Sequence, residues 1–156
     1  MNLHEQAEPL TEREVLAAAE ELVTAFSRTD TEAYFSAFSP EATFIFHPED
    51  RRLESRSDYQ DLWNSWLAGG WSITGCESTD ARVQLWGSSA VFSHTVKTTT
   101  RVGAVSETLV ERETIVFARE GGRILAVHEH LSTVPSPTRS STTAASAAVS
   151  AAGTAA

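Results

Sequence analysis

Apolar residues near the start of the chain recur every three or four positions, which is the period of an amphipathic helix. One apolar stripe runs from Val15 to Phe26, and Thr11 and Glu14 before it have the spacing of a capping box. A shorter helix follows and is ended by Pro40, because proline cannot continue a helix. The pattern therefore predicts two consecutive helices in the first part of the chain.

A strand and a third helix come next. Residues 43–47 have the β-branched and aromatic composition of a strand, which ends at Pro48. Ser57 and Gln60 form a second capping-box pattern, and the large apolar residues that follow lie on one side of a helix. The glycine pair at 69–70 ends this helix.

The rest of the sequence has the pattern of strands joined by glycine-containing turns. The predicted strands cover residues 71–86, with a bulge near Thr79–Asp80, and residues 90–101, 106–119 and 124–133. Consecutive strands with short connections pair antiparallel. Helices followed by such a meander predict an α+β fold, with three N-terminal helices on one face of a curved antiparallel sheet.

The composition changes near Val134. Residues 135–156 are almost entirely Ser, Thr, Ala and Pro, and Arg139 is their only charge. Such a segment buries too little apolar surface to offset its ordering entropy, so we expect a disordered tail. With a flexible lead-in at residues 1–10, this leaves one folded domain at residues 11–134.

Charge and cysteine content exclude several classes of protein. The 12 basic and 21 acidic residues give a net charge of −9, which argues against a nucleic-acid or anionic-membrane partner. A single cysteine, Cys76, excludes an internal disulfide and a multi-cysteine zinc site. No apolar run approaches the roughly 18 residues of a membrane span, and the start lacks a secretory-signal pattern. We therefore expect a cytoplasmic protein.

Histidines on the last predicted strand are the main candidates for chemistry. Strand alternation puts His128 and His130 on one face. If the glycines at 121–122 form a tight turn, Glu113 on the preceding strand lies opposite His130. A carboxylate beside an imidazole suits general acid–base catalysis, so these three residues are the predicted catalytic group. A one-residue slip would instead place Arg112 opposite His130.

Other residues could contact a substrate. A symmetric turn at Gly103 would place His94 near Arg112, on the face away from Glu113, and tryptophans at the end of the third helix could form an aromatic wall. Glu107 and Glu111 are interpreted as a solvated strand end. The candidate substrate contacts are Trp63, Trp66, His47, His94 and Arg112.

Two alternatives for the histidines stay open. In the first, they bind a divalent metal ion, because His-x-His on a strand projects both rings the same way. The candidate ligands are His47, His94, His128 and His130. In the second, His128, His130 and Ser132 form a structural hydrogen-bond network. Without the metal, no cofactor is expected.

The order of elements resembles the SnoaL-like, ketosteroid-isomerase-like superfamily, whose fold is the nuclear transport factor 2-like α+β cone. The closing segment at residues 121–132, with its His-x-His-x-Ser strand, is similar to the last hairpin of one branch. Arg112-x-Thr114 on the preceding strand is similar to that branch as well.

The resemblance implies a cone-shaped sheet whose concave face is covered by the helices and encloses an apolar pocket. It also implies a homodimer formed through the outer sheet face. Known members include isomerases, dehydratases, cyclases and pure binding modules. The expected function is therefore binding of a small hydrophobic molecule, with cofactor-free acid–base catalysis. The alternatives are a metal-dependent enzyme using the histidines and a non-catalytic dimerisation or ligand-sensing module.

Overall fold

The computed structural model describes residues 7–135 of the chain. The first six residues of the predicted lead-in and the predicted tail from residue 136 onward lie outside the described residues. Among the described helices, none is long and apolar enough to cross a membrane.

The first helix, α1 (Glu12–Ser27), begins where the capping box predicts. The Thr11 hydroxyl accepts a hydrogen bond from the Glu14 N–H at 3.2 Å, and the Glu14 carboxylate accepts one from the Thr11 N–H at 2.9 Å. These bonds satisfy N–H groups that have no partner within the first turn. The apolar stripe is buried at Val15 and Leu22, which confirms the predicted orientation of the helix.

The second helix, α2 (Thr31–Ser36), leads almost directly into strand β1 (Phe38–Phe46). The strand begins earlier than the predicted residues 43–47, so Pro40 lies inside it instead of ending the helix. The sheet tolerates this proline because β1 is an edge strand, where a missing N–H removes no bond on the open side.

The third helix, α3 (Arg56–Ala68), begins slightly before the predicted Ser57. Its N-cap is Ser55, whose hydroxyl accepts a hydrogen bond from the Asp58 N–H at 3.1 Å. The Asp58 carboxylate accepts a bond from the N–H of Glu54, the residue before the N-cap, at 3.1 Å, so the predicted Ser57–Gln60 capping box is wrong.

The remaining strands form a meander that returns to the start of the sheet. They are β2 (Trp71–Trp86), β3 (Ser89–Val102), β4 (Val105–Glu120) and β5 (Arg123–Thr133). The strand order is β1-β5-β4-β3-β2, and every neighbouring pair is antiparallel except β1 and β5, which run parallel. The α+β class and the curved sheet are confirmed. The parallel pair arises because the chain passes through α3 and the whole meander before β5 lies beside β1.

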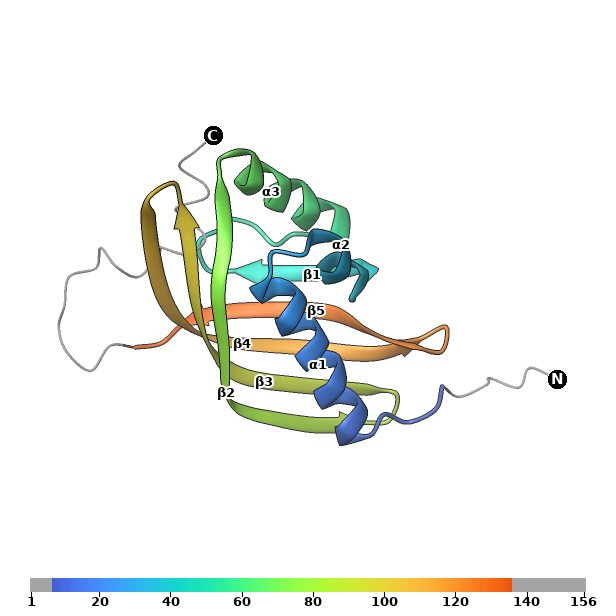
Figure 1. Ribbon diagram of the computed structural model, residues 1–156. Coiled ribbons are helices and arrows are strands. Elements are labelled where there is room, and N and C mark those ends of the chain that lie inside the picture. The colour runs from blue at the N-terminus through green and yellow to red at the C-terminus, as the bar shows by residue number, and fades with distance from the viewer. Residues whose placement is uncertain (1–6, 136–156) are drawn as a thin grey trace.

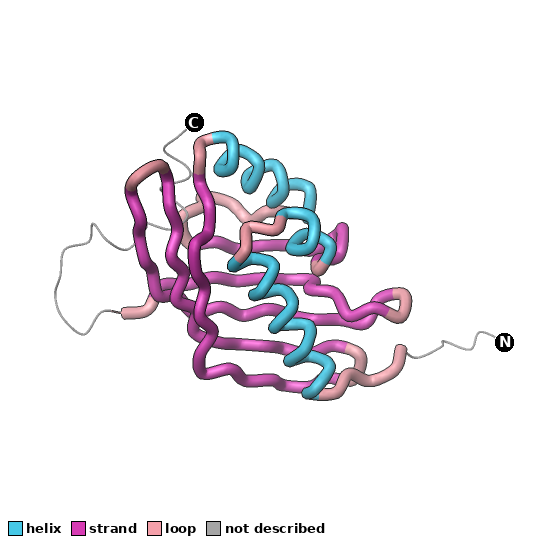
Figure 2. Tube along the Cα trace, viewed as in Figure 1, coloured by secondary structure: helices cyan, strands magenta, loops and turns pink. Residues whose placement is uncertain are grey.

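The sheet is strongly bent, and the helices lie on its concave side (Figures 1 and 2). Strand β2 pairs with β3 through two register shifts, one between Ile73 and Gly75 and one between Thr79 and Arg82. The second shift is the predicted bulge, where Asp80 has a φ of 54°. Bulges increase local twist and bend a strand, which lets the sheet curl around α1.

An aromatic core closes one end of this curl. Trp63 from α3 stacks on Tyr34 from α2 with ring centroids 5.1 Å apart. Phe38 and Phe44 of β1 are also 5.1 Å apart, and all four side chains are fully buried. The core holds α2, α3 and β1 together and leaves the region between α1 and the sheet to a cavity.

The register between β4 and β5 corrects a prediction about the catalytic group. The tight turn at 121–122 is confirmed, since Glu120 lies opposite Arg123 and both glycines have positive φ. A bulge then intervenes, because Phe117 pairs with Ala126 but Val116 pairs with His128.

This extra residue shifts every later pair. His130 therefore lies opposite Thr114, and Glu113 lies opposite Leu131, so the predicted Glu113–His130 pair is wrong. The alternative slip is wrong too, because Arg112 faces Ser132.

The turn at Gly103 also differs from the symmetric one predicted. Val102 pairs with Val105, so the turn contains two residues. His94 consequently lies opposite Glu113 and not near the Arg112 position. The two side chains share the concave face, because directly opposite residues point to the same side of a sheet.

Candidate functional site

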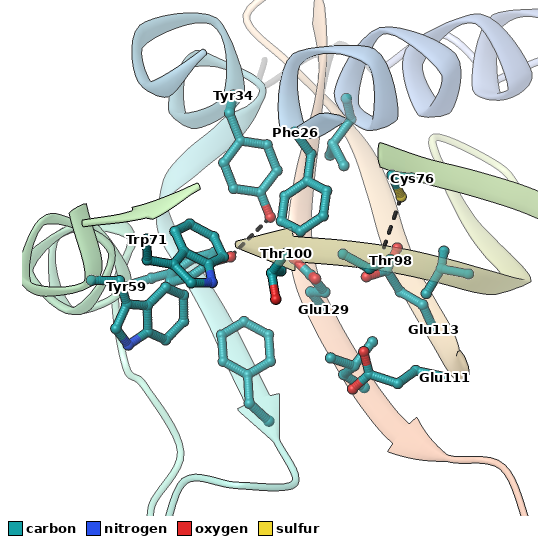
Figure 3. Close-up of a pocket in the computed structure, with 15 residues that line it drawn as sticks. Phe26, Tyr34, Tyr59, Trp71, Cys76, Thr98, Thr100, Glu111, Glu113 and Glu129 are labelled. Carbon is teal, nitrogen blue, oxygen red and sulfur yellow. Dashed lines mark hydrogen bonds between the residues drawn. The ribbon is translucent and has the colours of Figure 1, made fainter. Parts of the chain in front are cut away.

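A cavity lies between the concave face of the sheet and the helices. It measures about 50 Å³ as the space open to the centre of a water molecule. Aromatic rings line one side and three carboxyl groups line the other (Figure 3). An apolar hollow with a few convergent polar groups is the usual form of a small-molecule site.

The aromatic side holds two phenols and two indoles. The hydroxyls of Tyr34 and Tyr59 lie 3.1 Å apart and share a hydrogen bond. Burial raises the pKa of both phenols well above the ordinary value, so both stay protonated, and one of the two O–H groups donates to the other phenol. The indole nitrogens of Trp66 and Trp71 are buried and find no acceptor within residues 7–135. This side of the cavity therefore offers hydrogen-bond donors.

Glu113 lines the opposite side and is held by a buried histidine. Its carboxylate oxygen Oε1 lies 2.7 Å from Nε2 of His94, whose Nδ1 lies 2.6 Å from the Ser78 hydroxyl. An ionised carboxylate can only accept, so Nε2–H donates to Glu113 and Nδ1 accepts from Ser78. The imidazole is fixed from both sides and orients the Glu113 carboxylate in the cavity.

Glu111 is the second carboxyl, and the interpretation of this residue as a solvated strand end is wrong. It is 2% exposed, and its Oε2 lies 2.5 Å from Nε2 of His47. Burial raises the pKa of Glu111, while the hydrogen bond and the charge of His47 oppose that shift. His47 is thus the partner of a cavity carboxyl, and alternation along β4 places that carboxyl on the same face as Glu113.

Glu129 is the third carboxyl and lies beside Glu113 and Tyr34. It is 3% exposed, and its Oε2 has no hydrogen-bond partner in the described part of the chain. Burial, and secondly the negative charge of Glu113, raise the pKa of Glu129 well above the ordinary glutamate value. The side chain is therefore held toward its neutral form, in which it can both donate and accept a hydrogen bond.

Replacing Glu129 by glutamine is expected to make the protein more stable near neutral pH. The pKa of Glu129 is higher in the folded protein than in the unfolded chain. The contribution of this residue to stability is therefore fully present below the unfolded pKa and is lost as the pH rises through the folded pKa. Glutamine has the same shape and does not ionise, so in that window the variant gains up to about 1.4 kcal/mol per pH unit relative to wild type.

Urea unfolding followed by tryptophan fluorescence at a series of pH values measures this difference. Glu120→Gln, the same change at the exposed end of β4, is the matched control and should track wild type. A Glu129→Gln curve that stays parallel to wild type across this window would contradict the raised pKa.

Four of the predicted site residues lie in or beside the cavity. Glu113 and Trp66 line it, while His94 and His47 hold two of its carboxyl groups. Trp63 is packed behind the wall, where its indole N–H donates to the Thr31 hydroxyl at 2.9 Å.

The other predicted residues lie on the outer face of the sheet. His128, His130 and Arg112 pair with Val116, Thr114 and Ser132, which alternate with the buried positions. The Nδ1 atom of His128 lies 2.8 Å from the Thr43 hydroxyl, a contact that joins β5 to β1. His130 and Arg112 line a shallow polar groove on that face. The structure does not bring these three residues to the cavity.

The histidines of the metal hypothesis are divided between the two faces. His47 and His94 bind separate carboxyl groups inside, while His128 and His130 lie outside with ring centroids 6.3 Å apart. In residues 7–135, no group of three His, Cys, Asp or Glu side chains is close enough to hold a metal ion.

The most informative residue missed from the sequence is Glu129. A signal for it was present, because strand alternation places this acid on the same face as Leu131, among apolar neighbours. An acid on an apolar strand face is either paired or functional, since burying an unpaired carboxylate is costly.

A family model described as "SnoaL-like domain" matches residues 15–137. No curated protein matches the chain.

Several solved structures share the fold. A putative dehydratase of the NTF2-like family from Streptomyces avermitilis is 21% identical, with a TM-score of 0.69, over 80% of this chain and 96% of that one. An NTF2-like protein from Cytophaga hutchinsonii is 14% identical, with a TM-score of 0.67, over 80% and 100%. A putative calcium/calmodulin dependent protein kinase II association domain from Xanthomonas campestris is 16% identical, with a TM-score of 0.68, over 85% and 99%.

Proposed function

Because the chain belongs to the SnoaL-like domain family, we propose that it binds a small, largely apolar molecule inside the cone and moves a proton on it without a cofactor. The observation that carries this proposal is the buried Glu129 carboxyl beside Glu113 in an aromatic-lined cavity, where its Oε2 has no hydrogen-bond partner among the described residues. Isolated buried acids with shifted pKa values are concentrated at functional sites.

Glu113 is the proposed general base. Its carboxylate reaches the cavity, while His94 and Ser78 hold it from behind through a chain of short hydrogen bonds. A carboxylate on a fixed imidazole removes a proton from a carbon acid and returns it to a neighbouring atom. Isomerisation, dehydration and cyclisation all use such a step.

The donors opposite Glu113 are the proposed binding groups for a substrate oxygen. Tyr34 and Tyr59 stay protonated, and the indole N–H groups of Trp66 and Trp71 lack acceptors in the described chain. A carbonyl oxygen placed there would gain hydrogen bonds that strengthen as negative charge develops on it. Glu129 would anchor a further polar group of the substrate.

A non-catalytic ligand-binding or association module is the second candidate. Some solved structures with this fold are described as kinase association domains, and one from Streptomyces avermitilis is described as a putative dehydratase. A cavity containing three carboxyl groups favours the enzyme, because a purely structural interior would be apolar.

Cyclohexenone in heavy water tests the proposal. Binding of cyclohexenone is expected to quench or shift the tryptophan fluorescence of the protein, since Trp66 and Trp71 line the cavity. It should also exchange the hydrogens beside the carbonyl about 10²-fold faster than buffer, as followed by proton NMR. Binding without exchange would favour the non-catalytic module. The absence of both the fluorescence change and the exchange would contradict both functions.

Four further expectations from the sequence stay predictions. A catalytic role for His128 and His130, substrate contact by Arg112, a homodimer formed through that face and a cytoplasmic location are expected from the sequence alone.

A further inference from the structure

We infer that the molecule accepted by the cavity carries a positively charged amine on its apolar body, so that the ligand is a small organic ammonium ion. This inference rests on the proposed function, because it names the class of molecule that the same cavity binds. It comes from the charge and the chemistry of the cavity walls.

The charged groups on the cavity wall are all acidic. Glu111, Glu113 and Glu129 line it, and no arginine or lysine of the described residues does so. Two of the three have a histidine partner, whereas the Glu129 oxygen Oε2 has none. A carboxylate or phosphate ligand would be repelled by this wall, and a cation would be attracted.

The other wall suits a cation as well. Six aromatic side chains line the cavity, and Figure 3 shows Phe26, Tyr34 and Trp71 facing the region that holds the carboxyl groups. An ammonium group within about 6 Å of such a ring centroid is stabilised by the electron-rich face of the ring. Aromatic rings and carboxylates together are the usual surroundings of a bound ammonium ion.

Glu129 is the group that an ammonium would complete. Its oxygen is buried without a hydrogen bond, and an ammonium supplies three N–H donors in a compact head. The partner charge would also let Glu129 ionise inside the protein, which burial and Glu113 otherwise oppose. The cost of removing the ammonium from water cancels much of this gain, so we expect a preference of about tenfold over a neutral analogue.

Three ligands of nearly the same shape test the inference. Cyclohexylamine, cyclohexanol and cyclohexanecarboxylate are titrated into the full chain near neutral pH, with tryptophan fluorescence and calorimetry as readouts. We expect the amine to bind about tenfold more tightly than the alcohol, and the carboxylate to bind least. An alcohol that binds as tightly as the amine, or a carboxylate that binds best, would overturn the inference and leave the proposed ligand binding intact. If none of the three binds, the inference and the proposed use of the cavity both fail.

The variant Glu129→Gln separates the acid from the rest of the wall. It keeps the shape of the side chain and should reduce the ratio of amine to alcohol affinity about tenfold. Glu120→Gln makes the same change at an exposed position of the same strand pair and should keep the wild-type ratio. Equal ratios in both variants would overturn the role of Glu129.

Proton release gives an independent measurement. The titratable groups around Glu129 are Glu111 and Glu113 of β4, Tyr34 of α2, Tyr59 of α3 and Cys76 of β2, whose pKa burial raises to about 11. The phenols stay protonated, so ammonium binding should displace a proton chiefly from Glu129 and tighten as pH rises toward the pKa of the amine. Calorimetry in two buffers of different ionisation enthalpy should show a difference in binding heat for wild type and no such difference for Glu129→Gln. Equal heats in both buffers for wild type would contradict the release of a proton from Glu129.

Discussion

Replacing Trp63 by alanine is expected to lower the free energy of unfolding by about 3–5 kcal/mol. The side chain is 0% exposed, stacks on Tyr34 and contacts Phe35 edge-on, with ring centroids 5.5 Å apart. Its loss leaves a cavity where α2, α3 and β1 meet, and it also removes the donor to the Thr31 hydroxyl. The neighbouring helices are held by β1 and the sheet, so they can collapse into the gap only in part.

Urea unfolding followed by far-ultraviolet circular dichroism measures this loss without depending on the removed fluorophore. Trp86→Ala is the matched control, because Trp86 is 67% exposed at the end of β2 and should change stability by less than about 0.5 kcal/mol. Similar losses in the two variants would mean that the aromatic cluster is not the main core.

Replacing Glu113 by glutamine is expected to slow hydrogen exchange on cyclohexenone by about 10²–10⁴-fold, while the protein stays folded. Glutamine keeps the shape and a hydrogen bond to His94, but its amide cannot accept a proton at neutral pH. The binding of the ketone should change little, since the donors for its oxygen lie on the aromatic side.

Two further variants make this result specific. Thr114→Ala alters the adjacent residue of β4, which points to the outer face, and should exchange at the wild-type rate. His130→Ala examines the catalytic residue predicted from the sequence. Loss of exchange in His130→Ala, with Glu113→Gln active, would refute Glu113 as the base and favour the outer-face histidine.

Most helices and some turns were predictable because their signals are local. The capping box of Thr11 and Glu14, the glycine pair at 121–122 and the bulge near Asp80 each depend on a few neighbouring residues. The site depends instead on register, and register is sensitive to a single inserted residue. The bulge beside Ala126 therefore moved His130 away from Glu113 and turned Glu129 inward.

The sequence patterns did not predict which side chains of different elements contact each other. Glu111 shares a strand face with Glu113, but its burial was missed because its partner His47 lies 64 residues away, in the turn after β1. His94 meets Glu113 because the turn between β3 and β4 has two residues and not one. The first contact depends on how the sheet curls, which no local window of sequence records, and the second depends on the length of one turn.

The parallel pairing of β1 with β5 has a consequence for how the chain acquires its fold. Phe44 of β1 lies beside Glu129 of β5, so the strand that carries much of the aromatic core gains its neighbour only when the final strand arrives. Such a contact has a high contact order, and closing the intervening loop costs entropy before any packing rewards it. Synthesis on the ribosome would therefore leave β1 unpaired until β5 has emerged, and docking of this edge is expected to be a late and slow event in folding.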